Sequence, residues 1–354
     1  MKLAIDGYEA NASERVGVGR YAFEIIAAMA KHPKDFFSVD VYLPQPPKPH
    51  MPKATDAWKY HVAVPKPFWT FIGLPLALSI AKPDVVFSPT HYIPRWVNIP
   101  KVCAIMDISY LHYPEQFLPQ DLHKLIHWTA YSVRHSAKII TISEFSKRAI
   151  IEAYQVDPDR VVVVYPGLTM GKAKKPTAKK RYILSVGTLQ PRKNFVRLIE
   201  AFSRLPDKDI ELVIVGKKGW LYEEILEAPQ KFGVGGRIRF LDFVSDEALA
   251  GLYQHATCFV LPSLYEGFGL PVLEAMAHGV PVVVSNTSSL PEIAGEAGIY
   301  VDPEDITSIT KGMTRALTEN NSDRIEKGKI RAKSFTWEKA AEKVMDVLVD
   351  VVKK

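Results

Sequence analysis

Short runs of apolar, often β-branched residues alternate with amphipathic stretches along the whole of this 354-residue chain. The stretches between the runs carry apolar residues at helical spacing. Near-continuous apolar strands separated by helices are typical of parallel sheets with helices on both faces. The alternation therefore predicts an α/β fold, and it excludes disordered, collagen-like and coiled-coil chains.

The predicted elements form two sets. In the first half, the predicted strands are Lys2–Ile5, Val39–Leu43, Val85–Ser88, Lys101–Ile105 and Lys138–Ile142, and the predicted helices include Tyr21–Lys31, Asp121–His135 and Glu144–Tyr154. In the second half, the predicted strands are Tyr182–Val186, Glu211–Val215, Ile238–Leu241, Cys258–Leu261 and Val280–Val284, and the predicted helices include Asn194–Leu205, Asp246–His255 and Leu270–Ala277. Each set predicts a doubly wound parallel sheet.

The segment GKAKKPTAKKR at Gly171–Arg181 lies between the two sets and is polar and basic, with a central proline. Such a composition is typical of an interdomain linker. We therefore expect domains at residues 1–170 and 182–335, a linker at 171–181, and a helix at 336–354 that crosses back to the first domain. Ligands of doubly wound domains bind at the carboxyl ends of the strands, which points to the cleft between the domains.

Cysteine content and net charge limit the function classes. The two cysteines cannot build a disulfide framework or a four-cysteine zinc site, and both lie in apolar runs typical of buried thiols in a reducing compartment. The N-terminus lacks the apolar stretch of a signal peptide, so we expect a cytoplasmic protein. The net charge of +6 is compatible with nucleic acid, anionic lipid or phosphorylated substrates.

The most apolar segment is Phe68–Ala81, which is too short to span a bilayer and carries Pro75. It overlaps Lys66–Phe71, KPFWTF, where a cation adjoins aromatic residues. Lysine interacts with anionic lipid and tryptophan favours the interface, so this stretch predicts loose peripheral contact with an anionic membrane. Packing of Phe68 and Trp69 in the core is an equally good interpretation. No nucleic-acid partner is predicted, because the basic linker has only one adjacent aromatic residue.

The most informative stretch is Pro262–Ser285, PSLYEGFGLPVLEAMAHGVPVVVS. A glycine-containing loop follows the strand Cys258–Leu261 and leads into a helix that Pro271 can open. Backbone N–H groups of Gly267 to Leu270 can approach an anion there, and the helix dipole favours negative charge. This arrangement predicts a phosphate site.

Two carboxylates, Glu266 and Glu274, lie in and just after this loop, eight positions apart. Carboxylates accept hydrogen bonds from hydroxyls, so a pair beside a phosphate suggests recognition of a sugar. On spacing alone, a glutamate that complements the helix dipole plus a loop charge is the competing interpretation.

The E-x7-E pattern of Glu266 and Glu274 resembles the donor-binding signature of family 4 of the retaining glycosyltransferases. Other motifs match this family in order: RVGVGRYAFEI at Arg15–Ile25, SVGTLQPRKNFVRLIEAF at Ser185–Phe202, FLDFVSDEALAGLYQHA at Phe240–Ala256, SSLPEIAGEAGIYVDPED at Ser288–Asp305 and the closing FTWEKAAEKV. The resemblance covers nearly the whole chain, and within the family it is nearest to the O-antigen mannosyltransferase-like subgroup. It implies the GT-B fold, two facing Rossmann-like domains with parallel sheets.

The resemblance also implies roles for individual residues. Glu266 would hold hydroxyls of the donor sugar and Glu274 the ribose, whereas Arg192 and Lys193 would neutralise the diphosphate leaving group. Further donor-binding positions, which act mostly through the backbone, would be Gly17, Gly19, Gly216, Phe243, Val244, Gly267, Phe268, Gly269 and Leu270. Structural alternatives exist, such as a surface pair at a helix start for Arg192 and Lys193, and a plain turn for the first two glycines.

One position departs from the family pattern. The family usually has His-Asp where this chain has Met106-Asp107. Methionine cannot replace a histidine that lies near the reacting sugar. His91 or His112 could substitute for it, unless these histidines are only packed or surface residues. In a retaining front-face reaction the departing phosphate oxygen can take the acceptor's proton, and Asp107 could orient the acceptor.

No metal site is predicted. The D-x-D motifs at Asp157–Asp159 and Asp207–Asp209 fall between elements and indicate turns. His, Cys and carboxylate residues nowhere show metal-ligand spacing.

Together these features predict a retaining, metal-independent hexosyltransferase of cell-surface polysaccharide synthesis that needs no cofactor. Its donor would be a GDP- or UDP-linked sugar, with GDP-mannose first, and its acceptor a glycan or lipid-linked sugar. It would be cytoplasmic, with peripheral contact at the inner face of the membrane. The alternatives are a catalytically silent relative that binds nucleotide sugar, and a non-enzymatic two-domain ligand-binding protein.

Overall fold

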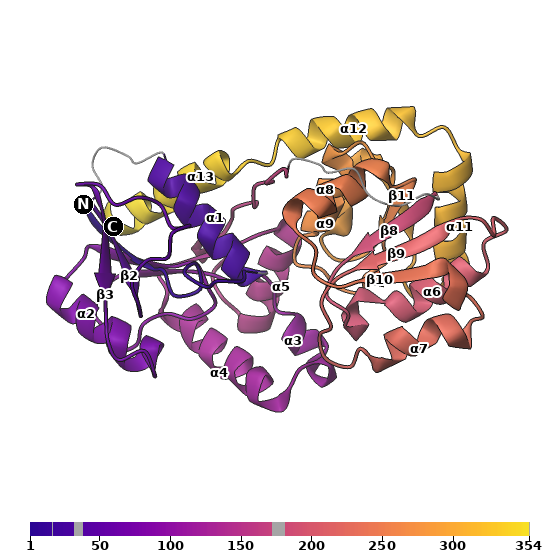
Figure 1. Ribbon diagram of the computed structural model, residues 1–354. Helices are drawn as coiled ribbons and strands as arrows, with labels where there is room; N and C mark the ends of the chain where they lie inside the picture. Colours follow the sequence, from indigo (N-terminus) through magenta and orange to yellow (C-terminus); the bar gives the residue numbers. More distant parts are fainter. Residues whose placement is uncertain (16, 32–37, 172–180, 354) are drawn as a thin grey trace. The chain divides into compact units, whose positions relative to one another are not determined.

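The computed structural model describes residues 1–15, 17–31, 38–171 and 181–353. These residues form two compact units, each with its own parallel sheet (Figure 1). Unit 1 comprises Met1–Ile108, Pro119–Gly167 and Phe335–Lys354, and unit 2 comprises Ser109–Leu118 and Leu168–Ser334. Most of the predicted linker, residues 172–180, lies outside the described residues.

The described part of unit 1 contains a seven-stranded parallel sheet with the order β3-β2-β1-β4-β5-β6-β7. Its strands are β1 (Lys2–Asp6), β2 (Ser38–Leu43), β3 (Trp58–Val62), β4 (Val85–Ser88), β5 (Lys101–Ala104), β6 (Lys138–Thr141) and β7 (Val161–Val163). The central strands are buried on both faces, as their continuous apolar runs predict. In the edge strand β3, exposed residues alternate with a buried and a half-buried one before the strand ends exposed, and this mixed pattern was not recognised in the sequence.

Unit 1 covers this sheet with helices from both ends of the chain. They are α1 (Val18–Lys31), α2 (Leu74–Ala81), α4 (Pro119–His135), α5 (Glu144–Tyr154) and α13 (Trp337–Lys353), with a π-helical turn at Trp69–Gly73. The C-terminal helix α13 packs against α1, where the rings of Tyr21 and Trp337 meet edge to face at 6.0 Å (Figure 1).

The described part of unit 2 contains a six-stranded parallel sheet with the order β10-β9-β8-β11-β12-β13. Its strands are β8 (Tyr182–Val186), β9 (Glu211–Val215), β10 (Ile238–Leu241), β11 (Cys258–Leu261), β12 (Val282–Ser285) and β13 (Gly298–Val301). The chain runs from β8 toward one edge and from β11 toward the other, so the order reverses between these two strands. In doubly wound sheets such a switch point is where ligands bind.

The helices of unit 2 are α3 (Ser109–His112), α6 (Phe195–Ser203), α7 (Glu223–Lys231), α8 (Asp246–His255), α9 (Leu270–Ala277), α10 (Leu290–Ala294), α11 (Ile306–Thr318) and α12 (Ser322–Lys333). The predicted α/β class with two doubly wound parallel sheets is confirmed. One predicted strand shifts from Val280–Val284 to Val282–Ser285, since Pro281 has no N–H to donate to the ladder.

The segment Ser109–Leu118 groups with unit 2, although we expected residues 1–170 to form one domain. The reason is aromatic packing: the rings of His112 and Tyr113 lie 5.3 Å and 6.1 Å from the ring of Tyr265 in unit 2. Both cysteines are buried as predicted, and burial raises the pKa of Cys103 to about 11 and that of Cys258 to about 12. They are structural thiols.

Candidate functional site

The loops that follow β8 and β11 meet at the switch point of unit 2. The first contains a 3₁₀ turn at Pro191–Lys193, and the second runs to the start of α9. Asn194 joins them, because its side-chain amide donates to the carbonyl of Pro262 (2.9 Å) and to that of Pro303 (2.7 Å). The N–H of Leu264 also donates to the carbonyl of Arg192 (2.9 Å). Two loops far apart in the sequence are therefore fixed against each other.

Glu266, which is buried, and the partly buried Lys193 and Arg192 form a charge cluster where these loops meet. Lys193 Nζ lies 2.6 Å from Glu266 Oε1, and a guanidinium nitrogen of Arg192 lies 3.5 Å from Glu266 Oε2. The same guanidinium donates to the carbonyl of Tyr265 at 2.6 Å. The side chains of the two cations are only 12% and 15% exposed, so they are not a surface pair at a helix start.

The cluster carries a net positive charge. Burial acts to raise the pKa of Glu266, but the adjacent Lys193 and Arg192 outweigh it and hold that pKa below its usual range. The carboxylate is therefore ionised at neutral pH and balances one of the two cations. One positive charge is left to attract an anion, as a diphosphate site requires.

The start of helix α9 adds a second feature suited to an anion. Gly269 precedes the helix with φ +105°, a conformation that glycine adopts without strain. The hydroxyl of Ser289 donates to the carbonyls of Glu266 (2.8 Å) and Phe268 (2.9 Å), and the N–H of Glu266 donates to Ser288 Oγ (3.2 Å). The loop that contains Gly267 and Phe268 is therefore buried and held in place before Leu270 opens the helix.

Glu274 lies on α9 and is held by a different partner. The hydroxyl of Tyr253 donates to Glu274 Oε2 at 2.8 Å, and the Tyr253 ring stacks on His278 at 5.5 Å. The two glutamates of the E-x7-E pattern thus differ in surroundings: Glu266 contacts cations, whereas Glu274 accepts from a neutral phenol.

The carboxyl ends of β9 and β10 place three more predicted residues on the same edge of the sheet. Phe243, which is 63% exposed, follows β10 together with Val244, and Lys217 Nζ lies 4.8 Å from the centre of the Phe243 ring. Gly216 follows β9, and a Cβ atom there would lie 1.9 Å from the carbonyl oxygen of Gly187. Its missing side chain lets the loops after β8 and β9 approach each other.

Asp107, Gly17 and Gly19 belong to unit 1. Asp107 follows β5, and the two glycines lie just before α1 and in its first turn. The N–H of the adjacent Met106 donates to His91 Nε2 at 3.2 Å. Burial lowers the pKa of His91, which Asp107 only partly opposes, so this imidazole is neutral at pH 7. His91 thus lies beside the position where the family usually has histidine, whereas His112 belongs to unit 2.

Several residues that build the site were missed in the sequence. Asn194 has a recognisable signal, since asparagine tolerates the positive φ of 61° that it adopts before α6. The SSLPEIAG motif contains Ser288 and Ser289 but gave no role for them. Nothing in the sequence pointed to Tyr253, because only the fold brings α8 beside α9.

Both D-x-D motifs are turns, as predicted. The carboxylate of Asp157 accepts from the N–H of Asp159 at 2.9 Å, and that of Asp207 accepts from the N–H of Asp209 at 3.0 Å. Within the described residues, no three His, Cys, Asp or Glu side chains gather as metal ligands would. None of the helices in the described part of the chain is both long and apolar enough to span a bilayer.

Two family models match the chain and together cover nearly all of it. Residues 16–170 match the model described as Glycosyltransferase Family 4, and residues 170–334 match Glycosyl transferases group 1. Among curated proteins, the O-antigen chain mannosyltransferase B of Escherichia coli is 34% identical over 280 residues, which are 74% of this chain and 73% of that protein.

Solved glycosyltransferases share the architecture at low identity. Sucrose-phosphate synthase of Thermosynechococcus elongatus superposes with a TM-score of 0.79 at 18% identity, over 99% of this chain and 98% of that one. Anabaena HepE in complex with UDP-glucose gives a TM-score of 0.73 at 16% identity, over 99% of each chain. These likenesses show the fold, which is GT-B. With the family models, the Escherichia coli relative and a charged switch-point site all in agreement, this chain belongs to the family 4 glycosyltransferases.

Proposed function

We propose that this glycosyltransferase moves a mannosyl unit from GDP-mannose to a glycan or lipid-linked acceptor in cell-surface polysaccharide synthesis. The Escherichia coli relative, named as an O-antigen chain mannosyltransferase, supports both the sugar and the acceptor class. The UDP-glucose in the HepE complex makes a UDP-linked hexose the second candidate donor. The proposed enzyme works at the cytoplasmic face of the membrane, without nucleic acid, metal or other cofactor.

The observation that carries this proposal is the charge cluster of Lys193, Arg192 and Glu266. When the glycosidic bond of the donor breaks, negative charge builds on the β-phosphate and its bridging oxygen. Fixed cations at that point interact more strongly with the transition state than with the ground state, which is the condition for catalysis. Two partly buried cations on one carboxylate provide this without a metal ion.

The reaction that we propose retains the configuration at the anomeric carbon. The bond from this carbon to the β-phosphate oxygen breaks, and its electron pair leaves with the phosphate. The acceptor oxygen attacks from the same face, and its proton passes to the departing phosphate oxygen. Asp107 orients the acceptor, and Met106 takes no part because its thioether cannot relay a proton.

The other predicted residues hold the donor. Glu266 accepts from sugar hydroxyls and Glu274 from the ribose, while Phe243 and Val244 contact the base. Backbone groups of the loops complete the donor site, at Gly17, Gly19, Gly216, Gly267, Phe268, Gly269 and Leu270. The buried, braced loop before α9 supports these roles, because a fixed loop loses little entropy when the donor binds.

Donor identity is tested by thermal shift with GDP-mannose, UDP-glucose, GDP and UDP. A ligand at about 100 times its dissociation constant stabilises the folded protein by roughly 2.7 kcal/mol, which is easily measured. We expect GDP-mannose to give the largest shift. A shift by UDP-glucose alone would replace the donor, and the absence of any shift would contradict nucleotide-sugar binding.

Activity is tested with the preferred donor and a mannose-terminated lipid-linked acceptor, in the presence and absence of EDTA. We expect transfer that survives chelation and an axial linkage by NMR, which is retention of the α-configured donor. Loss of transfer in EDTA with recovery in manganese would refute metal independence. Donor binding without transfer or donor hydrolysis would identify a catalytically silent relative.

A further inference from the structure

Exposed apolar side chains recur along residues 68–81 of unit 1, which comprise a π-helical turn and α2. Phe68, Ile72, Leu76 and Ile80 follow one another at intervals of four residues, and their exposed fractions are 70%, 45%, 55% and 78%. Leu76 and Ile80 are four residues apart on α2 and share one helix face, and Ile72 and Phe68 continue the exposed run through the π-helical turn to its N-cap. We call this surface the α2 stripe.

The opposite face of the same segment is apolar as well. Trp69, Leu74 and Leu78 point into the core of unit 1 and are almost fully buried. The one hydroxyl within α2, that of Ser79, donates to the carbonyl of Pro75 at 2.9 Å, so its hydrogen bond is made within the helix. A helix that is apolar on all sides is expected to be covered on all sides. Among the described residues of unit 1, the α2 stripe remains exposed, so it needs an apolar environment from elsewhere.

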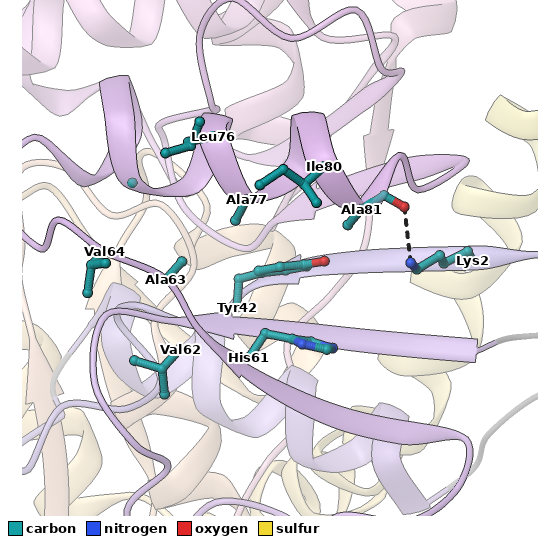
Figure 2. Close-up of a pocket in the computed structure, with 11 residues that line it drawn as sticks. Lys2, Tyr42, His61, Val62, Ala63, Val64, Leu76, Ala77, Ile80 and Ala81 are labelled. Atoms are coloured by element: carbon teal, nitrogen blue, oxygen red, sulfur yellow. Dashed lines mark hydrogen bonds between the residues drawn. The ribbon is translucent and has the colours of Figure 1, made fainter.

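Strand β3 extends the stripe sideways. Figure 2 shows an open groove with Val62 and Val64 on one side and Leu76, Ala77 and Ile80 on the other. The two valines are 52% and 68% exposed. Six large aliphatic or aromatic side chains are thus exposed together, which is more than single scattered residues would explain.

Exposed lysines flank the α2 stripe in the sequence. Residues 59–83 contain no aspartate or glutamate, whereas Lys59, Lys66 and Lys82 are all exposed. Acids of neighbouring segments have partners: Asp40 lies 2.6 Å from His61 and 3.4 Å from Lys2, Asp84 accepts from the Lys2 N–H at 2.7 Å, and Asp6 accepts from the Trp69 indole at 3.0 Å. An apolar surface flanked by exposed lysines is complementary to an anionic, apolar partner.

Trp96 marks a border of the same surface. Its side chain is 75% exposed, and its ring lies 5.9 Å from Phe71, which in turn contacts the Arg95 guanidinium at 4.6 Å. Trp96 also has a φ of 57°, which is uncommon for a bulky residue. Exposed tryptophan beside a cation is typical of the zone between lipid tails and head groups.

We propose that the α2 stripe, with Val62, Val64 and Trp96, docks unit 1 onto an anionic lipid bilayer. The aliphatic side chains enter the acyl boundary, and the lysines contact the phosphate groups. A second copy of the chain fits less well, because lysine is depleted at protein interfaces. The inference deepens the proposed function by naming the surface that meets a membrane-embedded acceptor, and it rests on that function only for the identity of the acceptor.

The structure divides the earlier membrane hypothesis into two parts. Trp69 is buried, and its indole N–H donates to Asp6 at 3.0 Å, so this tryptophan belongs to the core. Phe68 is exposed and begins the α2 stripe. The membrane contact that we infer therefore depends on α2 rather than on KPFWTF as a unit.

Vesicle flotation of the full chain tests the proposal. We expect binding to vesicles of equal parts phosphatidylglycerol and phosphatidylcholine, weaker binding to phosphatidylcholine alone, and release by salt, which screens the lysines. Ile80→Glu should lower the partition coefficient at least about tenfold, because it puts a charge where an aliphatic group enters the lipid. Ile330→Glu on α12 is the matched control, as Ile330 is 62% exposed in unit 2 and should leave binding unchanged.

Three outcomes would overturn the inference: no binding of the wild-type chain to either vesicle, equal losses in Ile80→Glu and Ile330→Glu, or a wild-type dimer in ultracentrifugation that Ile80→Glu dissociates. The last would assign the α2 stripe to a second copy. Donor binding in solution separates this test from that of the proposed function. Ile80→Glu should bind GDP-mannose as wild type does, so a failure of vesicle binding and a failure of donor binding are distinguishable.

Discussion

Asp6 in unit 1 and Glu266 in unit 2 are both buried carboxylates at or beyond the carboxyl ends of central strands, yet their pKa values shift in opposite directions. Asp6 ends β1 and accepts from two neutral donors, the N–H of Tyr8 (3.1 Å) and the indole N–H of Trp69 (3.0 Å). Burial dominates there and raises the pKa of Asp6 to about 6. At Glu266 burial acts in the same direction, but two cations reverse it.

The difference shows that burial alone does not decide the state of a carboxyl group. When a buried carboxylate has only neutral donors, no nearby cation offsets its desolvation, so its pKa is raised. One that faces Lys193 and Arg192 stays ionised and can exchange those cations with an incoming diphosphate. The charge cluster of unit 2 is therefore suited to the charged ligand that we propose, whereas Asp6 anchors the segment that bears the α2 stripe through Trp69.

Removing Lys193 should give the largest effect. In Lys193→Ala we expect turnover to fall by about 10²–10³, because one fixed stabiliser of developing charge is lost. Lys193→Arg should recover only part of the activity, since a planar guanidinium does not reproduce a compact ammonium. Initial rates at saturating donor check this, with circular dichroism to verify folding.

The matched control for this change is Lys231→Ala, an exposed lysine of unit 2 that should change turnover less than about twofold. Arg192 serves the same diphosphate, so the double variant should be worse than either single variant without being additive. A turnover of folded Lys193→Ala within twofold of wild type would end the leaving-group assignment.

The two carboxylates should give opposite pH dependence of stability. The folded protein holds the proton of Asp6 more tightly than the unfolded chain does, so this group makes stability fall as pH rises from about 4 to about 6. A pKa raised from 3.8 to about 6 corresponds to about 3 kcal/mol. Asp6→Asn keeps the hydrogen-bond acceptor but cannot ionise. Its stability relative to wild type should therefore rise by about 3 kcal/mol between pH 4 and pH 7.

Urea unfolding at several pH values measures this difference in the free energy of unfolding. Glu266→Gln provides the contrast: its carboxylate stabilises the fold above the ordinary glutamate pKa, and this contribution disappears as pH falls. The stability of Glu266→Gln relative to wild type should therefore increase as pH falls. The comparison fails if the free energies of unfolding of both variants, relative to wild type, change in the same direction as pH changes.

Glu274 should affect binding more than turnover. In Glu274→Gln we expect roughly tenfold weaker binding of both GDP and GDP-mannose, because a charge-assisted hydrogen bond to the unreacting ribose is lost from ground and transition states alike. Glu266→Gln should mainly slow turnover, since it touches the sugar whose charge changes. Calorimetry and steady-state kinetics on the two variants check the ranking.

Tyr253→Phe is the smallest change in this series, as it removes only the phenol that positions Glu274. It should weaken donor binding in the same direction by a few-fold. If Glu266→Gln weakens binding more than Glu274→Gln does, the two roles are wrongly distributed.

Local pattern was enough to predict most of the secondary structure. Tyr182–Val186, Asp246–His255 and Leu270–Ala277 have the bounds that their apolar periodicity predicts. The edge strand β3 was missed because an exposed strand lacks a continuous apolar run. The short segment Ser109–Leu118 groups with unit 2 rather than with the first half of the chain, since the contact of His112 with Tyr265 joins residues more than 150 positions apart.

The sequence by itself determined that the chain forms two parallel α/β sheets, because strand and helix periods are local properties of neighbouring residues. It also indicated Glu266, Lys193 and Arg192 as candidates through the family pattern. Only the tertiary structure decided that these three side chains touch, that Asp6 and Glu266 ionise at different pH, and that α2 is apolar on its outer face. Contact, burial and exposure depend on which distant segments the sheet brings together, and no local pattern contains that information.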